Sequence, residues 1–263
     1  MNKKIVLLLV FFSQFVFSQH LKLAVVKSDL ISLDADDFVG FDGFNNCFYT
    51  KNNVLYKKVD TTLLQYQNLG LGKISSVDIL NPLKVVLFYE EFNSVIILDN
   101  QLNEVQKIEF SKLETPILAS AIGMSGQNKL WVFNSLNQQI GLFDLSSNQL
   151  QIVGNPLKDV MIFYQTNFNY FQFIDKNNQW NTYTIFGRFF QSGTVEEHTQ
   201  IQFIDDKKYF FVANGLLFLK DVTSNKIYEI EIVEKSFKKF YYKDQILSIF
   251  TNEGITNYKI TLP

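Results

Sequence analysis

Short apolar stretches rich in Phe, Tyr, Ile, Val and Leu alternate along the chain with clusters of Asn, Asp, Gly and Ser. Typical examples are 53–59, 84–89, 94–98, 129–133 and 208–212. Stretches of this length between turn-forming residues predict β-strands joined by tight turns. No segment keeps a helical period of 3.6 residues over three turns, and Pro116 interrupts the nearest one, 111–120. The pattern therefore predicts an all-β protein with almost no helix.

The predicted strands repeat at two levels. The tetrapeptide Asn-Pro-Leu-Lys occurs at 81–84 and again 74 residues later at 155–158, and each copy precedes two strands that end in Asp. At a finer level, apolar strands end in an aspartate at Asp60, Asp99, Asp144, Asp175 and Asp221, with spacings of 39, 45, 31 and 46 residues. Aspartate opens turns by accepting hydrogen bonds from the backbone that follows it. A spacing of about 40 residues is typical of the four-stranded blade of a β-propeller.

The repeat predicts about six four-stranded blades, at 28–67, 68–110, 111–154, 155–195, 196–233 and 234–263. The uneven spacing leaves five or seven blades open. The last unit is too short for an outer strand, whereas the apolar stretch 21–26 has no blade of its own. We expect this N-terminal strand to complete the last blade, because that closes the ring and removes an open sheet edge. The expected domain is a single propeller over 19–263.

The first 18 residues have the features of a signal peptide. Lys3 and Lys4 form a basic start, an apolar stretch follows, and Val16 and Ser18 provide the small residues that precede a cleavage site. The apolar stretch is shorter than the roughly 20 residues that span a bilayer. No cysteine lies near the cleavage point to carry a lipid anchor. We therefore predict a signal peptide at 1–18 and an exported chain without a membrane span, with an uncleaved anchor as the alternative.

Composition and charge exclude several classes of protein. The chain is 47% hydrophobic and 19% charged with a net charge of −2, which excludes a disordered chain. Its single cysteine, Cys47, excludes an internal disulfide framework and a cysteine-based zinc site, and we expect it to be a small buried hydrophobic residue. Arg188 is the only arginine, and with the mild net acidity it argues against nucleic acid as a partner.

Side chains typical of catalytic centres are sparse. The two histidines, His20 and His198, are isolated, and no motif for nucleophilic, phosphate-binding or zinc chemistry occurs. Aspartates 34, 36, 37 and 42 crowd the first blade without the spacing of a calcium-binding loop. We expect no catalytic residue, cofactor or metal. Two alternatives stay open: a hydrolase or lactonase-like propeller with a metal in its channel, and a glycan-binding module that uses Trp131 or Trp180.

Aromatic residues make up 16% of the chain, with 27 Phe and 12 Tyr. Exposed aromatic residues with few charges around them favour protein interfaces. The competing interpretation is that they are buried between blades. The candidate partner-binding residues lie in or near predicted turns, and they are Tyr89, Phe92, Phe168, Tyr170 and Trp180.

The end of the predicted signal peptide, Phe-Ser-Gln19, the Asn, Lys, Phe and Tyr content and the scarcity of Arg resemble exported proteins of the Bacteroidota, in particular the flavobacteria. Segment 81–104 resembles a motif of flavobacterial propeller-like proteins, and the resemblance covers 60–130. It implies no catalytic residues. The chain ends on a blade strand, where exported cargo of the type 9 secretion system carries a sorting domain. On this resemblance we expect a non-enzymatic periplasmic propeller that docks onto an outer-membrane protein complex, such as the type 9 secretion translocon or the outer-membrane insertion machinery.

Overall fold

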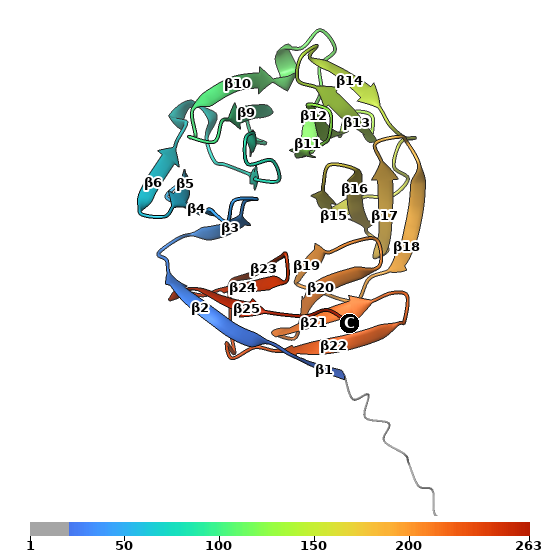
Figure 1. Cartoon of the computed structure of the whole chain (residues 1–263). Helices are drawn as coiled ribbons and strands as arrows, with labels where there is room; N and C mark the ends of the chain where they lie inside the picture. Colours follow the sequence, from blue (N-terminus) through green and yellow to red (C-terminus); the bar gives the residue numbers. More distant parts are fainter. Residues whose placement is uncertain (1–20) are drawn as a thin grey trace, which may run out of the picture.

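The computed structural model describes residues 21–263, and the predicted signal peptide lies outside this range. Six β-sheets form a ring around a central axis, as Figure 1 shows. The prediction of an all-β, six-bladed propeller is confirmed. Within 21–263 the only helical segments are two short 3-10 turns, η1 (Leu69–Leu71) and η2 (Phe110–Lys112). No helix in this range is long and apolar enough to cross a membrane.

Each blade contains an antiparallel meander whose first strand lies nearest the axis and whose fourth strand lies on the outer side of the other three (Figure 1). Blades 1 to 3 contain β3 (Asp37–Phe41), β4 (Cys47–Lys51), β5 (Val54–Val59) and β6 (Thr62–Tyr66); β7 (Ser76–Asp78), β8 (Val85–Tyr89), β9 (Ser94–Leu98) and β10 (Glu104–Glu109); and β11 (Ala119–Met124), β12 (Lys129–Asn134), β13 (Gln139–Asp144) and β14 (Gln149–Ile152). Blades 4 to 6 contain β15 (Met161–Thr166), β16 (Tyr170–Asp175), β17 (Gln179–Thr184) and β18 (Phe189–Thr194); β19 (Gln200–Phe203), β20 (Lys208–Ala213), β21 (Leu216–Asp221) and β22 (Lys226–Glu231); and β23 (Lys239–Lys243), β24 (Ile246–Phe250) and β25 (Gly254–Lys259).

Two N-terminal strands close the ring. β2 (Val26–Ser32) pairs antiparallel with β25 and is the outer strand of blade 6, whereas β1 (Leu21–Ala24) pairs parallel with β22 as a fifth strand of blade 5. The predicted N-terminal closure is confirmed, but the closing strand is 26–32, not 21–26. The pattern missed β2 because an outer strand is mostly exposed and needs no apolar run.

A buried polar network fixes the register of the closing strand. Asn257 on β25 is 7% exposed, and its side-chain NH₂ donates to the Asp29 carboxylate on β2 at 3.0 Å. The Ser248 hydroxyl donates to the Asn257 amide oxygen at 2.6 Å, and the Ser28 hydroxyl donates to the Asn257 carbonyl at 3.1 Å. A slip of one residue would place Asn257 opposite the wrong side chains, so the network selects one pairing.

The hydrophobic core lies between neighbouring blades. Each strand sends alternate side chains to its two faces, and both faces of the middle strands are covered by other blades. All ten residues of β8 and β9 are buried, and Trp180 in blade 4 stacks on Phe203 in blade 5 with ring centroids 4.3 Å apart. Burial between blades therefore accounts for many of the aromatic residues. Cys47 is 5% exposed in this core, as expected, and burial raises its pKa to about 12.

One of the aspartates that predicted the blade repeat lies in a different turn from the others. Asp99, Asp144 and Asp221 open the turn between third and fourth strands, but Asp175 opens the turn between second and third strands. In blade 4 the equivalent position is Thr184, whose hydroxyl accepts the backbone N–H groups of Phe186 and Arg188. With Thr184 in place of Asp175 the spacings 31 and 46 become 40 and 37.

The 74-residue repeat does not describe equivalent positions. Residues 81–84 lie between the first two strands of blade 2, whereas 155–158 lie in the connection from blade 3 to blade 4. Two loops that need the same turn chemistry can share a tetrapeptide at unrelated places in the ring. The predicted blade bounds hold nevertheless, except that 28–32 belongs to blade 6.

The loops lie on two opposite faces of the ring. The inter-blade face carries the connections between blades, 33–36, 67–75, 110–118, 153–160, 195–199 and 232–238, together with the turns between second and third strands. The hairpin face carries the turns between first and second strands and between third and fourth strands. Each inner strand therefore runs from the inter-blade face to the hairpin face.

Candidate functional site

Side chains clamp neighbouring inner strands together around the axis. The Gln165 side chain on β15 donates to the Phe203 carbonyl at 2.8 Å and accepts the Phe203 N–H at 2.9 Å. Gln202 on β19 makes the same pair of bonds with Tyr242, at 2.7 and 2.8 Å. Asp78 on β7 accepts the Met124 N–H at 2.6 Å, and burial raises the pKa of its carboxyl. These bonds satisfy backbone groups that have no strand partner on the axial side.

Two glycines alter this pattern. Beside Gly123 on β11, a side chain of the next blade makes the contact. The Tyr164 hydroxyl accepts the Ile122 N–H and donates to the Ile122 carbonyl, both at 3.3 Å. At Gly40 on β3 the ring of Tyr241 from blade 6 fills the space that a Cβ would need, 2.8 Å from the nearest ring atoms. Among residues 21–263, no side-chain hydrogen bond joins β3 to β7. The junction between blades 1 and 2 is thus the one without an inner-strand clamp in the described chain.

A cavity of about 780 Å³ opens at this junction on the inter-blade face. Its lining includes Asp37, Lys73, Ser76, Val77 and Lys239. The Lys239 ammonium donates to both carboxylate oxygens of Asp37 at 2.9 and 3.1 Å, which ties blade 6 to blade 1 at the rim. A second cavity of about 510 Å³ lies on the other side of Lys239 and includes His198. The two cavities share Lys239 and have both polar and apolar side chains in their lining, such as Val77 in the first and Ile201 in the second.

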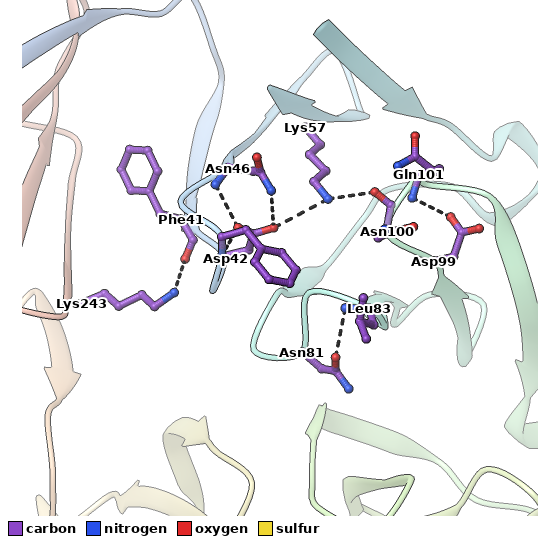
Figure 2. A network of polar contacts seen from close by, with 11 residues as sticks. Phe41, Asp42, Asn46, Lys57, Asn81, Leu83, Asp99, Asn100, Gln101 and Lys243 are labelled. Carbon is purple, nitrogen blue, oxygen red and sulfur yellow. Dashed lines mark hydrogen bonds and ion pairs between the residues drawn. The ribbon is translucent and has the colours of Figure 1, made fainter. Parts of the chain in front are cut away.

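Below the unclamped junction, blade 1 contains a buried ion pair whose lysine also contacts blade 2 (Figure 2). Asp42 is 0% exposed and Lys57 is 3% exposed, with the ammonium nitrogen 3.7 Å from a carboxylate oxygen. The carboxylate also accepts the N–H groups of Phe44 and Asn46, at 2.8 and 2.9 Å. Lys57 donates in turn to the Asn100 carbonyl of blade 2 at 2.8 Å. The pair therefore has the additional hydrogen bonds that a buried charge requires.

The crowded aspartates of the first blade do not converge. Asp34 pairs with Lys51, Asp36 accepts the Asn52 N–H, Asp37 pairs with Lys239 and Asp42 pairs with Lys57. No group of three or more His, Cys, Asp or Glu side chains suited to a metal ion occurs within the described residues. Each carboxylate of this set has its own structural contact.

Four exposed apolar side chains lie in neighbouring loops of the inter-blade face, over blades 2 and 3. We call this set the apolar arc, and it comprises Leu69, Phe92, Leu118 and Leu136, with exposed fractions of 86, 51, 46 and 64%. Exposed apolar side chains that lie together, rather than singly, mark interaction sites.

Specific contacts hold the arc together. The Phe92 ring packs over Gly72, which belongs to the same connection as Leu69. The next residue, Asn93, donates from its side chain to the Ile117 carbonyl at 2.6 Å and accepts the Ala119 N–H at 3.0 Å, so Phe92 lies beside Leu118. The Asn134 amide oxygen accepts the N–H groups of both Leu118 and Leu136, at 3.1 and 3.2 Å.

The five candidate partner-binding residues are dispersed. Tyr89 and Trp180 are 0 and 1% exposed, so the expectation that Trp180 lies in an exposed turn is wrong: it lies in β17, packed on Phe203. Trp131, the other tryptophan considered for glycan binding, is also buried. Tyr170 is half-buried against the edge of the Phe190 ring. Phe92 and Phe168 are both exposed, but Phe92 lies on the inter-blade face and Phe168 on the hairpin face.

Sequence reasoning missed the three leucines of the arc because it considered only aromatic residues. A usable signal was present. Each leucine lies beside turn-forming residues, in Asn68-Leu69-Gly70, near Pro116 before Leu118, and in Ser135-Leu136-Asn137. A large apolar residue within a turn has no strand face on which to be buried, which predicts an exposed side chain.

Comparison with known proteins shows the fold. No family model and no curated protein sequence matches the chain. The structure of YCF48 bound to D1 peptide is similar, with a TM-score of 0.59 and 12% identity over 92% of this chain and 100% of that one. Virginiamycin B lyase from Staphylococcus aureus has a TM-score of 0.57 and 12% identity over 91% of this chain and 94% of that one. A catalytically inactive variant of that lyase with quinupristin gives 0.54 and 14%, over 89 and 88%.

Proposed function

We propose that this propeller is a non-enzymatic protein-binding platform whose inter-blade face docks a partner over the apolar arc. The observation that carries the proposal is the grouping of Leu69, Phe92, Leu118 and Leu136, four exposed apolar side chains in neighbouring loops that hydrogen bonds hold together. Exposed apolar residues bordered by polar loop residues have the composition of an interface core with a polar surround. The similarity to YCF48, which was solved with a bound peptide, supports this use of the fold.

The cellular setting that we propose is the periplasm, with the partner a subunit of an outer-membrane protein complex such as the type 9 secretion translocon. Support for this setting comes from the signal-peptide prediction and the resemblance to flavobacterial exported proteins, both described above. The proposed docking face does not depend on this setting, because the support for it comes from burial and contacts alone.

Replacing Phe92 and Leu118 together with serine should release the partner without unfolding the ring. Both side chains are about half exposed, so their truncation changes stability by roughly 0.5 kcal/mol each or less. Interface anchors of this type cost 2 kcal/mol or more when truncated, about a 30-fold loss of affinity. The measurement is recovery of partner proteins with the tagged chain from detergent-extracted envelopes of the native host, together with a thermal melt.

The matched control is Phe168→Ser, an exposed phenylalanine on the hairpin face. It should leave partner recovery unchanged. Equal recovery with wild-type protein and the Phe92→Ser, Leu118→Ser variant would refute the proposal, and so would loss of recovery with Phe168→Ser alone.

An enzyme of the lyase type is the second candidate. The similarity to virginiamycin B lyase fits it, and His198 lies beside the cavity of about 510 Å³ that also includes Lys238 and Lys239. The Nδ1 atom of His198 contacts the Glu196 carbonyl at 2.8 Å, which leaves Nε2 for other contacts. Incubation of the purified chain with quinupristin separates the two candidates, because conversion of quinupristin that is lost with His198→Ala would favour the enzyme.

A further inference from the structure

Three exposed carboxylates border the middle of the apolar arc, with Glu90 and Glu91 in the turn that carries Phe92 and Glu114 in the connection that carries Leu118. None of these three carboxylates has an ion-pair partner within residues 21–263. Lys112, in the same connection as Glu114, is paired with Glu109. The Glu91 carboxylate lies directly beside the arc, because it folds over Gly72 next to the Phe92 ring. An apolar anchor placed on the arc would therefore be within reach of uncompensated negative charge.

The opposite side of the same face carries exposed charges of both signs, with Asp36, Glu197 and Glu253 as well as Lys235 and Lys238. Lys27, Lys235 and Lys238 line a cavity of about 560 Å³ beside blade 6. Of the two acidic residues in its lining, Glu234 accepts a hydrogen bond from the Tyr258 hydroxyl at 2.6 Å, which leaves Glu253 at the surface.

Charge at the border of an apolar patch selects its partner. Opposite charges steer association and fix orientation, whereas like charges brought together cost several kcal/mol. A partner segment that buries large apolar side chains on the arc must bring its flanking residues against Glu90, Glu91 and Glu114. Lysine or arginine at those flanks would be attracted, and aspartate or glutamate would be repelled. Two exposed lysines without an ion-pair partner in the described part of the chain lie at the ends of the arc, Lys73 near Leu69 and Lys158 near the turn of Leu136, so the carboxylates act on the anchors at Phe92 and Leu118.

We propose that the occupant of the apolar arc is a segment of a partner protein with at least two large apolar anchors flanked by lysine or arginine. This inference rests on the proposed function and adds the chemistry of the partner to it. An acidic segment, or an anionic membrane surface, would meet repulsion from the same three carboxylates. A second copy of this chain is a different occupant, which the test below must separate.

The test uses the purified chain and three fluorescent peptides of 12 residues. The first has leucines on one helical face and lysines elsewhere, the second has glutamate in place of each lysine, and the third has serine in place of each leucine. We expect the first to bind at least tenfold more tightly than the other two at about 50 mM salt, and the preference to shrink as added salt screens the charges. Fluorescence anisotropy gives the three affinities.

Two double variants locate the interaction. Reversal of charge at the arc, Glu91→Lys with Glu114→Lys, should weaken the lysine peptide at least tenfold and strengthen the glutamate peptide. The matched control, Glu197→Lys with Glu253→Lys, makes the same change in net charge on other blades of the same face. It should change neither affinity more than twofold. A control variant as damaging as the arc variant would overturn the inference, because the peptide would then respond to overall charge.

The remaining outcomes separate this inference from the proposed function. If none of the peptides binds, or the lysine and glutamate peptides bind equally, while Phe92→Ser with Leu118→Ser still releases the native partner, the basic flanks are wrong and the docking face stands. A dimer in sedimentation that dissociates on Phe92→Ser identifies a second copy as the occupant and also overturns the inference. If the lysine peptide binds the arc as described and the double serine variant keeps its native partner, the arc has the stated chemistry but the proposed function fails.

Discussion

Replacing Gly254 with alanine should disrupt the pairing between β2 and β25 that closes the ring. Gly254 begins β25 with a φ of +133°, a conformation that residues with a Cβ rarely adopt. A Cβ built there would lie 2.1 Å from the carbonyl oxygen of Ile31 and 2.8 Å from the backbone nitrogen of Leu33. Both atoms belong to the backbone of the closing segment, so neither can rotate away. β2 must shift, and with it the polar network around Asn257.

The expected loss for Gly254→Ala is about 3 kcal/mol or more, since backbone strain alone costs 1–3 kcal/mol in this region and the displaced strand adds to it. In a domain of this size that lowers Tm by roughly 6–12 °C. The matched control is Gly193→Ala, because Gly193 has a φ of +118° with nothing within 4 Å of the added Cβ. It should show the backbone strain without the steric clash. Calorimetry of both variants tests this, and equal shifts in Tm would show that contact with β2 is unimportant.

Methionine at position 57 should destabilise the junction between blades 1 and 2 by about 3–5 kcal/mol. The substitution removes the ammonium and leaves the Asp42 carboxylate, which is fully buried, without its counter-charge, which is the costly way to break a buried pair. It also removes the donor to the Asn100 carbonyl, the hydrogen bond by which Lys57 contacts blade 2. Urea unfolding gives the change in the free energy of unfolding.

The control for Lys57→Met is Lys22→Met, which breaks the exposed pair between Lys22 and Glu231. An exposed pair contributes about 1 kcal/mol or less. The double variant Lys57→Met with Asp42→Asn should recover part of the loss, because it removes the uncompensated charge. A loss below about 1 kcal/mol for Lys57→Met would contradict the role given to this pair.

The fold could be predicted from the sequence because turn chemistry and strand length repeat with the blades. Asp99, Asp144 and Asp221 mark equivalent turns, and the count of six survived an error at Asp175 because Thr184 performs the same backbone capping with a hydroxyl. The closing strand was misplaced by a few residues, since β2 is exposed and has no apolar alternation to detect.

The residues of the candidate site were harder to predict from the sequence than the fold. Phe92 was identified by its turn, but burial of Tyr89 and Trp180 depends on the neighbouring blade, which a single sequence does not specify. The same holds for Gly40, whose small size matters only because Tyr241, about 200 positions away, packs against it. The two loops that carry Phe92 and Phe168 have similar sequences and lie on opposite faces, because one joins second and third strands and the other joins first and second strands.

Site-specific photo-crosslinking in the native host tests the docking face most directly. A photoreactive amino acid is placed singly at Phe92, Leu118 and Leu136 on the inter-blade face, and at Phe44 and Phe168 on the hairpin face, all of them exposed in the structure. The account predicts that the three inter-blade positions crosslink to the same partner protein and that the two hairpin positions do not. Crosslinks from Phe44 or Phe168 alone, or from no position on the apolar arc, would contradict it.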